Sequence, residues 1–205
     1  MGDRRLDQPL ILYLHGFTSG PQSKKAQALA RRMAQRGLAD RFFCPQLPAS
    51  PAAAIRLAEE IITKLGAGGT ARITLVGSSL GGFYATYLAE VHGSKAVLVN
   101  PAVVAALELE PYLGPHTWLH SGEPFEFTRA HIAELSALEV PRIKDPSRYW
   151  LLVEEGDETL DYRVAVARYA GARQTVLPGG DHSFTRWEDY LEEIIVFAGF
   201  AECET

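Results

Sequence analysis

Two adjacent serines, Ser78 and Ser79, stand among glycines directly after an apolar run. In the stretch Gly77-Ser78-Ser79-Leu80-Gly81 the pattern G-x-S-x-G fits in one register only, with Ser79 at its centre. A serine in that position lies on a sharp turn from a strand into a helix, with its hydroxyl exposed at the sheet edge. Gly77 and Gly81 would permit the turn, because larger side chains would meet the nearby backbone. The pattern favours Ser79 as a nucleophile over a glycine-rich turn with two incidental serines.

A serine hydroxyl is a weak nucleophile at neutral pH and needs a base. In folds with this turn, the partners follow in the chain order serine, acid, histidine. His182, in the stretch PGGDHSF, follows the last expected strand through glycines and precedes the last expected helix. We expect it to be the base, the alternative being an ordinary exposed loop histidine. The other histidines lie beside the wrong elements or in an irregular stretch: His15, His92, His116, His120 and His131.

An acidic partner is expected after a strand between the serine and the histidine. Asp157 follows an apolar run and a glycine in WLLVEEGDETLDY, and we expect it to hold the imidazole tautomer and stabilise the imidazolium. Asp161 fits the N-cap of the next helix instead. Asp181 is adjacent to the histidine in sequence, where side chains seldom face each other. The other competitors near the strand end are Glu154, Glu155 and Glu158.

An oxyanion hole needs two backbone N–H groups aimed at the developing charge. One is expected from Leu80, the residue after the nucleophile, and the other from Phe17 in the loop LHGFTSG. Gly16 lets that loop approach the serine, and His15 is then expected to be a hydrogen-bonded structural histidine. This chemistry requires neither a metal nor a cofactor.

Short apolar runs alternate with segments of helical periodicity along the chain. The expected strands cover residues 10–14, 41–47, 71–77, 94–101, 148–157 and 173–180. The expected helices cover residues 24–36, 51–65, 80–92, 161–169 and 185–197, with N-caps at Ser23 and Ser50 and glycine stops at 37, 66 and 93. Such alternation is typical of a parallel sheet covered by helices on both faces. At 205 residues, a single domain is expected.

One long stretch breaks this alternation, because no clear strand is expected between Pro101 and Pro146. Structureless connections of this length are uncommon in compact domains and are often functional. We therefore expect a cap over a pocket, the cap segment, at residues 102–146. The alternative is a helical excursion whose aromatic side chains belong to the core. Basic side chains in and after this segment could meet a substrate phosphate or could be solvated: Arg129, Arg142, Lys144 and Arg148.

The composition disfavours several classes of protein. Hydrophobic residues make up 47% and charged residues 22% of the chain, as in ordinary globular proteins. The net charge of −5 disfavours nucleic-acid binding, which usually requires a basic excess. The apolar run 9–14 is too short for a signal peptide or a membrane span, and Cys44 and Cys203 form no metal-binding cluster. We expect a cytoplasmic protein with reduced thiols that binds neither nucleic acid nor membrane, and the oligomeric state stays open.

Residues 66–71, GAGGTA, fit the letters of the dinucleotide-binding pattern G-x-G-x-x-G/A. That pattern must follow a strand and open a helix, so that the pyrophosphate meets the helix N-terminus. Here it follows a helix and precedes a strand, so we read it as a connector and expect no nucleotide site.

Three stretches together resemble the serine α/β-hydrolases, and more narrowly the small YqiA/YcfP-type esterases: LYLHGFTSGPQSKKA, VGSSLGGFYATYLA and GDETLDY with GGDHSF. They span nearly the whole chain. The resemblance implies a three-layer α/β-hydrolase fold with a mostly parallel sheet. It also implies a hydrolase of carboxylic or thioesters, in which Ser79, Asp157 and His182 match the family triad.

We expect a serine esterase that forms an acyl-enzyme intermediate on a small-molecule ester. An acyl-CoA thioesterase could use the same triad. A hydrolase-like scaffold that binds without catalysis is a third hypothesis, and the intact set of candidate residues disfavours it. A dehalogenase is disfavoured because its chemistry requires a carboxylate at position 79.

Overall fold

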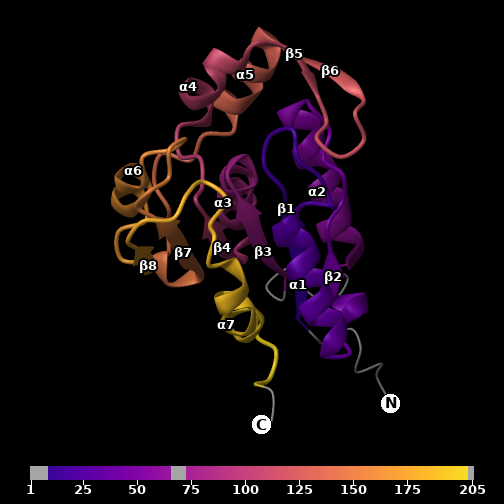
Figure 1. Ribbon diagram of the computed structural model, residues 1–205, viewed down its shortest axis with the longest axis vertical. Helices are drawn as coiled ribbons and strands as arrows, with labels where there is room; N and C mark the ends of the chain where they lie inside the picture. Colours follow the sequence, from indigo (N-terminus) through magenta and orange to yellow (C-terminus); the bar gives the residue numbers. More distant parts are fainter. Residues whose placement is uncertain (1–8, 66–72, 203–205) are drawn as a thin grey trace.

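A computed structural model describes residues 9–65 and 73–202 of the chain. Within these residues, six parallel strands form a sheet in the order β2-β1-β3-β4-β7-β8 (Figure 1). Their bounds are β1 (Leu10–Leu14), β2 (Phe42–Phe43), β3 (Ile73–Ser78), β4 (Lys95–Val99), β7 (Tyr149–Glu154) and β8 (Arg173–Leu177). Since every pairing in this sheet is parallel, all the strands end at the same edge.

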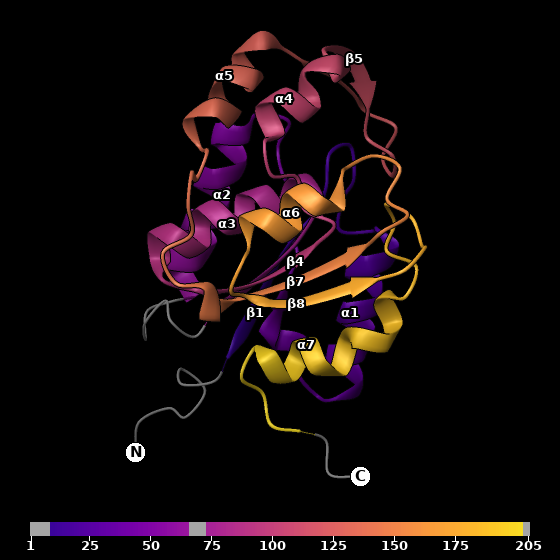
Figure 2. The same ribbon diagram turned by 90° about the vertical axis from the view of Figure 1, so that its left-hand side faces the viewer.

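Helices cover both faces of the sheet, as Figure 2 shows with α6 on one side of β7 and β8 and α7 on the other. Helices α1 and α7 pack on one face, and α2, α3 and α6 pack on the opposite face. The bounds are α1 (Lys24–Gln35), α2 (Pro51–Leu65), α3 (Leu80–His92), α6 (Tyr162–Arg168) and α7 (Leu191–Phe197). No helix in the described parts of the chain is both long enough and apolar enough to cross a membrane.

Strand β1 illustrates why the sequence forms a sheet buried on both sides. Successive side chains of a strand point to opposite faces. Leu10, Leu12 and Leu14 join the core under α2 and α3, whereas Ile11 and Tyr13 join the core under α1 and α7. A strand covered on both faces therefore reads as a continuous apolar run, as expected for a parallel sheet between helices.

The strands expected at 94–101, 148–157 and 173–180 are shorter in the structure, as β4, β7 and β8, and two further elements differ more. The strand expected at 41–47 pairs only at Phe42–Phe43, at the edge of the sheet, and Pro45 soon after lacks the N–H that a longer ladder would need. The helix expected from residue 185 starts later, at Trp187, with the 3₁₀ helix η5 (Trp187–Tyr190) before α7. The connector 66–71, the start of the third expected strand, the stop at Gly66 and Cys203 lie outside the described residues.

The expectation that the cap segment contains no strand is wrong. An antiparallel hairpin pairs β5 with β6, with His116 opposite Phe125. Both strands have four residues and contain a proline, so the sequence pattern resembles a loop, yet an exposed two-stranded ribbon tolerates proline. The bounds in this segment are α4 (Ala105–Leu109), η3 (Glu110–Tyr112), β5 (Gly114–Thr117), β6 (Pro124–Phe127) and α5 (Arg129–Ala137).

Helix α3 approaches the sheet unusually closely at its first turn. A Cβ at Gly81 would overlap the backbone carbonyl of Leu14 in β1, and a Cβ at Gly77 would overlap the carbonyl of Gly81. Backbone atoms cannot move aside as the end of a side chain can. The two glycines are thus required by the packing of α3 against β1 and β3.

We expect Gly81→Ala to lower the free energy of unfolding by about 3 kcal/mol or more, because a new methyl group would press on backbone. Gly93→Ala is the matched control. Gly93 ends the same helix at φ 70° with no atom within 4 Å of its would-be Cβ, so that change should cost only about 1–2 kcal/mol of backbone strain. Urea denaturation measures both. Equal losses for the two variants would contradict the proposed packing constraint.

Candidate active site

The candidate side chains come from the carboxyl ends of several neighbouring strands. Ser79 follows β3 directly, Asp157 lies three residues after the end of β7, and His182 lies in the loop after β8. The expected oxyanion loop follows β1. Ligand sites of open parallel sheets lie at this edge, so the topology alone brings these loops to one place.

Ser79 lies on a strained turn. Its backbone has φ 55° and ψ −123°, a conformation that residues with a side chain rarely adopt. Hydrogen bonds hold it there: Ser79 N donates to Val99 O at 3.0 Å, and Ala102 N donates to Ser79 O at 3.1 Å. The surrounding packing thus maintains a turn that the residue itself would not favour.

The structure brings Ser79, His182 and Asp157 into one hydrogen-bonded row. The imidazole Nε2 of His182 lies 3.1 Å from Ser79 Oγ. The other ring nitrogen, Nδ1, lies 2.8 Å and 3.0 Å from the two carboxylate oxygens of Asp157. A carboxylate accepts from an Nδ1–H, which leaves Nε2 free to accept the serine proton.

Asp157 is held as an anion by its surroundings, with its side chain 2% exposed. Burial alone would raise the pKa of this carboxyl, but hydrogen bonds from His182 and from the backbone N–H groups of Leu160 and Thr159 lower the pKa below its ordinary value. The carboxylate is therefore charged at neutral pH and fixed in orientation.

The loop after β1 runs beside the serine. A Cβ at Gly16 would lie 3.2 Å from Ser79 Cβ and 3.7 Å from Ser79 Oγ. The backbone N–H groups of Phe17 and Leu80, the two expected oxyanion donors, donate no hydrogen bond to any other residue that the structure describes. Two unengaged amides beside a serine hydroxyl are suited to a developing oxyanion.

His15 fixes this loop. Its ring is 3% exposed, with Nδ1 3.0 Å from Gly16 O and Nε2 accepting from Leu47 N at 2.9 Å. These partners select the neutral tautomer with the proton on Nδ1. Burial lowers the pKa of His15, so the ring stays neutral. It is the structural histidine that the sequence predicts.

Glu154 has a role at the site that its position at the end of a strand does not indicate in the sequence. Its side chain is fully buried, and its carboxylate accepts from Asp181 N at 2.9 Å, Thr185 N at 3.0 Å and Arg186 Nε at 3.0 Å. Burial alone would raise the pKa of Glu154, but these hydrogen bonds lower it further than burial raises it. The signal in the sequence was a carboxylate closing an otherwise apolar strand, which must be paired if buried.

Asn100, at the end of β4, was also missed. Its side-chain amide donates to Asp181 O at 3.0 Å and His182 O at 3.2 Å, while its Oδ1 accepts from Glu154 N at 3.0 Å. Its backbone φ is 40°, in the region where asparagine is enriched among non-glycine residues. Asn100 and Glu154 thus attach both sides of the His182 loop to adjacent strand ends.

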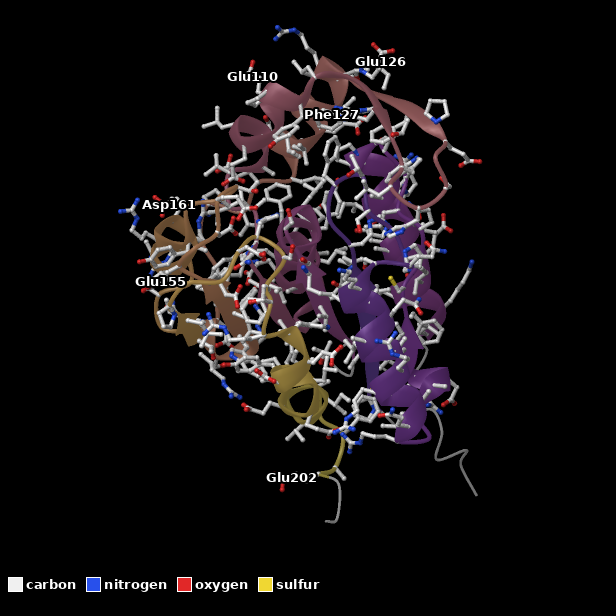
Figure 3. The ribbon with its side chains drawn as sticks, viewed as in Figure 1. Glu110, Glu126, Phe127, Glu155, Asp161 and Glu202 are labelled. Carbon is white, nitrogen blue, oxygen red and sulfur yellow. The ribbon has the colours of Figure 1, made fainter. Side chains whose placement is uncertain are left out.

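The competing acids lie elsewhere or have other tasks. Asp161 caps α6 by accepting from Arg163 N at 3.0 Å, and with Glu155 it points outward from the molecule (Figure 3). Asp181 accepts from Ser183 N at 2.8 Å, and Glu158 accepts from His182 N at 3.0 Å. Neither carboxylate contacts the His182 ring, so Asp157 is the one acid on that ring among the described residues.

Two further histidines and Arg148 have partners outside this row. His116 contacts Tyr112 O within the cap segment, and His131 accepts from Thr128 N as part of the capping box of α5. Arg148 precedes β7, at the opposite edge of the sheet, and pairs with Glu90 at 2.9 Å.

Solved structures of other proteins have the fold described above, and one protein-family model matches almost the whole chain. The model of an uncharacterised protein family, UPF0227, matches residues 10–199. A protein of Agrobacterium vitis S4 that is assigned as a hydrolase is 21% identical, with a TM-score of 0.71 over 94% of this chain and 88% of that chain. A monoacylglycerol lipase of Paleococcus ferrophilus is 17% identical, with a TM-score of 0.67 over 93% and 95% of the two chains. Mouse alpha/beta hydrolase domain-containing protein 10 is 16% identical, with a TM-score of 0.65 over 92% and 90%. The predicted α/β-hydrolase fold is confirmed.

The charge of Glu154 leads to a pH-dependent prediction. Glu154→Gln should lower the free energy of unfolding at pH 7 by about 3 kcal/mol, because Arg186 loses its buried partner. A carboxyl with a lowered folded-state pKa stabilises the fold above its unfolded pKa of about 4.3, and this contribution disappears as the pH falls through the folded-state value. The difference between wild type and variant should therefore shrink below about pH 4.

Urea denaturation between pH 7 and pH 3 measures this difference. Glu155→Gln, an exposed neighbour, is the control and should stay within about 0.5 kcal/mol of wild type at neutral pH. A Glu154→Gln difference that is unchanged at pH 3 would show that the carboxylate charge is not what stabilises the loop.

Proposed function

The chain belongs to the uncharacterised protein family UPF0227, and we propose that it is a serine hydrolase that cleaves carboxylic esters of small molecules. The observation that carries the proposal is the hydrogen-bonded row of Ser79, His182 and Asp157. Ser79 Oγ lies 3.1 Å from His182 Nε2, and His182 Nδ1 lies 2.8 Å from Asp157 Oδ2. Ser79 lies on a strained turn at the carboxyl edge of a parallel sheet, which is the position of the serine in a nucleophile elbow. Resemblance in fold to a monoacylglycerol lipase supports the class of reaction.

In the first half of the proposed reaction, Ser79 Oγ attacks the ester carbonyl carbon while His182 Nε2 takes the hydroxyl proton. The carbonyl oxygen becomes an oxyanion, and the N–H groups of Phe17 and Leu80 donate to it. When the tetrahedral intermediate collapses, the bond to the alcohol breaks. The alcohol leaves with the proton from His182, and the acyl group stays on Ser79.

In the second half, His182 Nε2 accepts a proton from water, and the resulting hydroxide attacks the acyl carbon. The same amides hold the second oxyanion. Its collapse breaks the bond to Ser79 Oγ, which recovers the proton from His182, and the carboxylic acid is released. Atoms and charges balance with water as the co-reactant.

Asp157 acts through His182 in both halves. Because its carboxylate is ionised and nearly buried, it stabilises the imidazolium each time it forms. It also keeps the proton on Nδ1, which orients Nε2 toward the serine.

Replacing the two adjacent serines separately tests the proposal. Ser79→Ala should lower kcat for p-nitrophenyl acetate by about 10⁴-fold or more, because no other group can form the acyl-enzyme. Ser78→Ala should stay within about tenfold of wild type, because Ser78 is buried at the end of β3 and its hydroxyl meets Tyr13 in the core under α1 and α7.

Circular dichroism and a thermal melt would confirm that both variants fold. Retention of wild-type turnover by folded Ser79→Ala, or its loss in folded Ser78→Ala, would refute the assignment of the nucleophile.

A further inference from the structure

A pocket of about 270 Å³, counting its open mouth, lies beside the two oxyanion amides. Its walls come from the loop after β1, the segment before α2, the first turns of α3, and the β5–β6 hairpin. The lining residues include His15, Leu47, Pro48, Ala49, Leu80 and Trp118.

The position of the pocket relative to His182 decides which part of an ester it can hold. His182 comes from the loop after β8, on one side of β3, whereas the pocket is built on the β1 side and does not include His182. The leaving alcohol must receive its proton from His182, so it lies on the β8 side. The acyl group, which stays on Ser79, is directed to the β1 side.

The lining suits an uncharged aliphatic chain. Leu47, Pro48, Ala49 and Leu80 contribute apolar surface, and no Lys or Arg is among the lining residues to bind an anion. The one ionisable base, His15, is kept neutral by burial, which lowers its pKa, and by its two backbone partners.

Trp118 forms the wall contributed by the cap segment, and it is held firmly. Its ring stacks on Phe125 with centroids 4.5 Å apart and meets His15 edge-on at 6.3 Å. The next residue, Leu119, donates its backbone N–H to Thr18 O at 2.9 Å, which joins the hairpin to the oxyanion loop.

Aromatic side chains of the cap segment also enclose Phe17. The centroid of its ring lies 5.0 Å from that of Phe127, 5.8 Å from that of Phe125 and 6.1 Å from that of Tyr112, and each pair meets edge to face. Phe127, labelled in Figure 3, lies at the cap end of the molecule, and its side chain is 1% exposed. The hairpin thus packs on the loop that supplies one expected oxyanion amide.

From this geometry we propose that the pocket holds the acyl group and that Trp118 sets its length, so that the protein acts on short-chain acyl esters such as acetyl and propionyl esters. The inference rests on the proposed esterase function and adds the substrate class. The hairpin then has two tasks: it closes the acyl pocket, and it supports the oxyanion loop through the Leu119–Thr18 hydrogen bond.

The test is a series of p-nitrophenyl esters, acetate, butyrate and octanoate, measured as kcat/KM. Wild type should prefer acetate over octanoate by about tenfold or more, since single methylenes can change such ratios by that much. Trp118→Ala should reduce this preference by at least about tenfold by opening the pocket. Leu107→Ala, an exposed position on α4 of the same cap segment, is the control and should keep the wild-type ratio.

A second variant acts in the opposite direction, in case Trp118→Ala does not fold. Ala49→Leu fills the pocket from its other wall and should lower kcat/KM for butyrate relative to acetate by about tenfold. No hydrolysis of any ester by wild type would overturn the proposed function itself. Hydrolysis with equal rates for acetate and octanoate, or an unchanged chain-length ratio in both folded pocket variants, would overturn the acyl-pocket proposal and leave the esterase proposal intact.

Discussion

The backbone of Ser79 is held at φ 55° and ψ −123°, and the arrangement of the whole site depends on that turn. The turn exists because α3 begins against β1 with no side chain at Gly81 and because Val99 O and Ala102 N bond the Ser79 backbone. Held in this way, the Ser79 hydroxyl projects over the carboxyl edge of the sheet. The loops that follow β1, β7 and β8 reach the same edge because all strands of this sheet are parallel.

The His182 loop has to match the serine to within a hydrogen-bond length, and polar groups at strand ends provide that match. Glu154 closes β7 and binds two backbone N–H groups of the loop, while Asn100 after β4 binds two of its carbonyls. Lys25 Nζ, at the start of α1, also donates to Ser183 O at 2.6 Å. A loop held by these hydrogen bonds needs little reorganisation when charge develops beside it, which is the basis of electrostatic preorganisation.

Much of the fold could be predicted because it is local. The bounds of β1 follow from an apolar run, and the end of α3 follows from a glycine stop. Ser79, Asp157 and His182 could be chosen because they come after successive expected strands in the order serine, acid, histidine. Glu154 and Asn100 could not be assigned, because their partners in the His182 loop lie 27–82 residues away and only the folded sheet brings them together. The β5–β6 hairpin was missed because its stability comes from packing Trp118 and Phe125 on the oxyanion loop, which local propensity does not report.

We propose above all that Ser79, and not its neighbour Ser78, is a nucleophile activated by His182. The most direct measurement is labelling of the folded protein with a fluorophosphonate, followed by peptide mass spectrometry to locate the adduct. We expect one adduct, on Ser79, formed by wild type and much more slowly by a folded His182→Ala variant. An adduct on Ser78, or no reaction of the folded wild type, would contradict it.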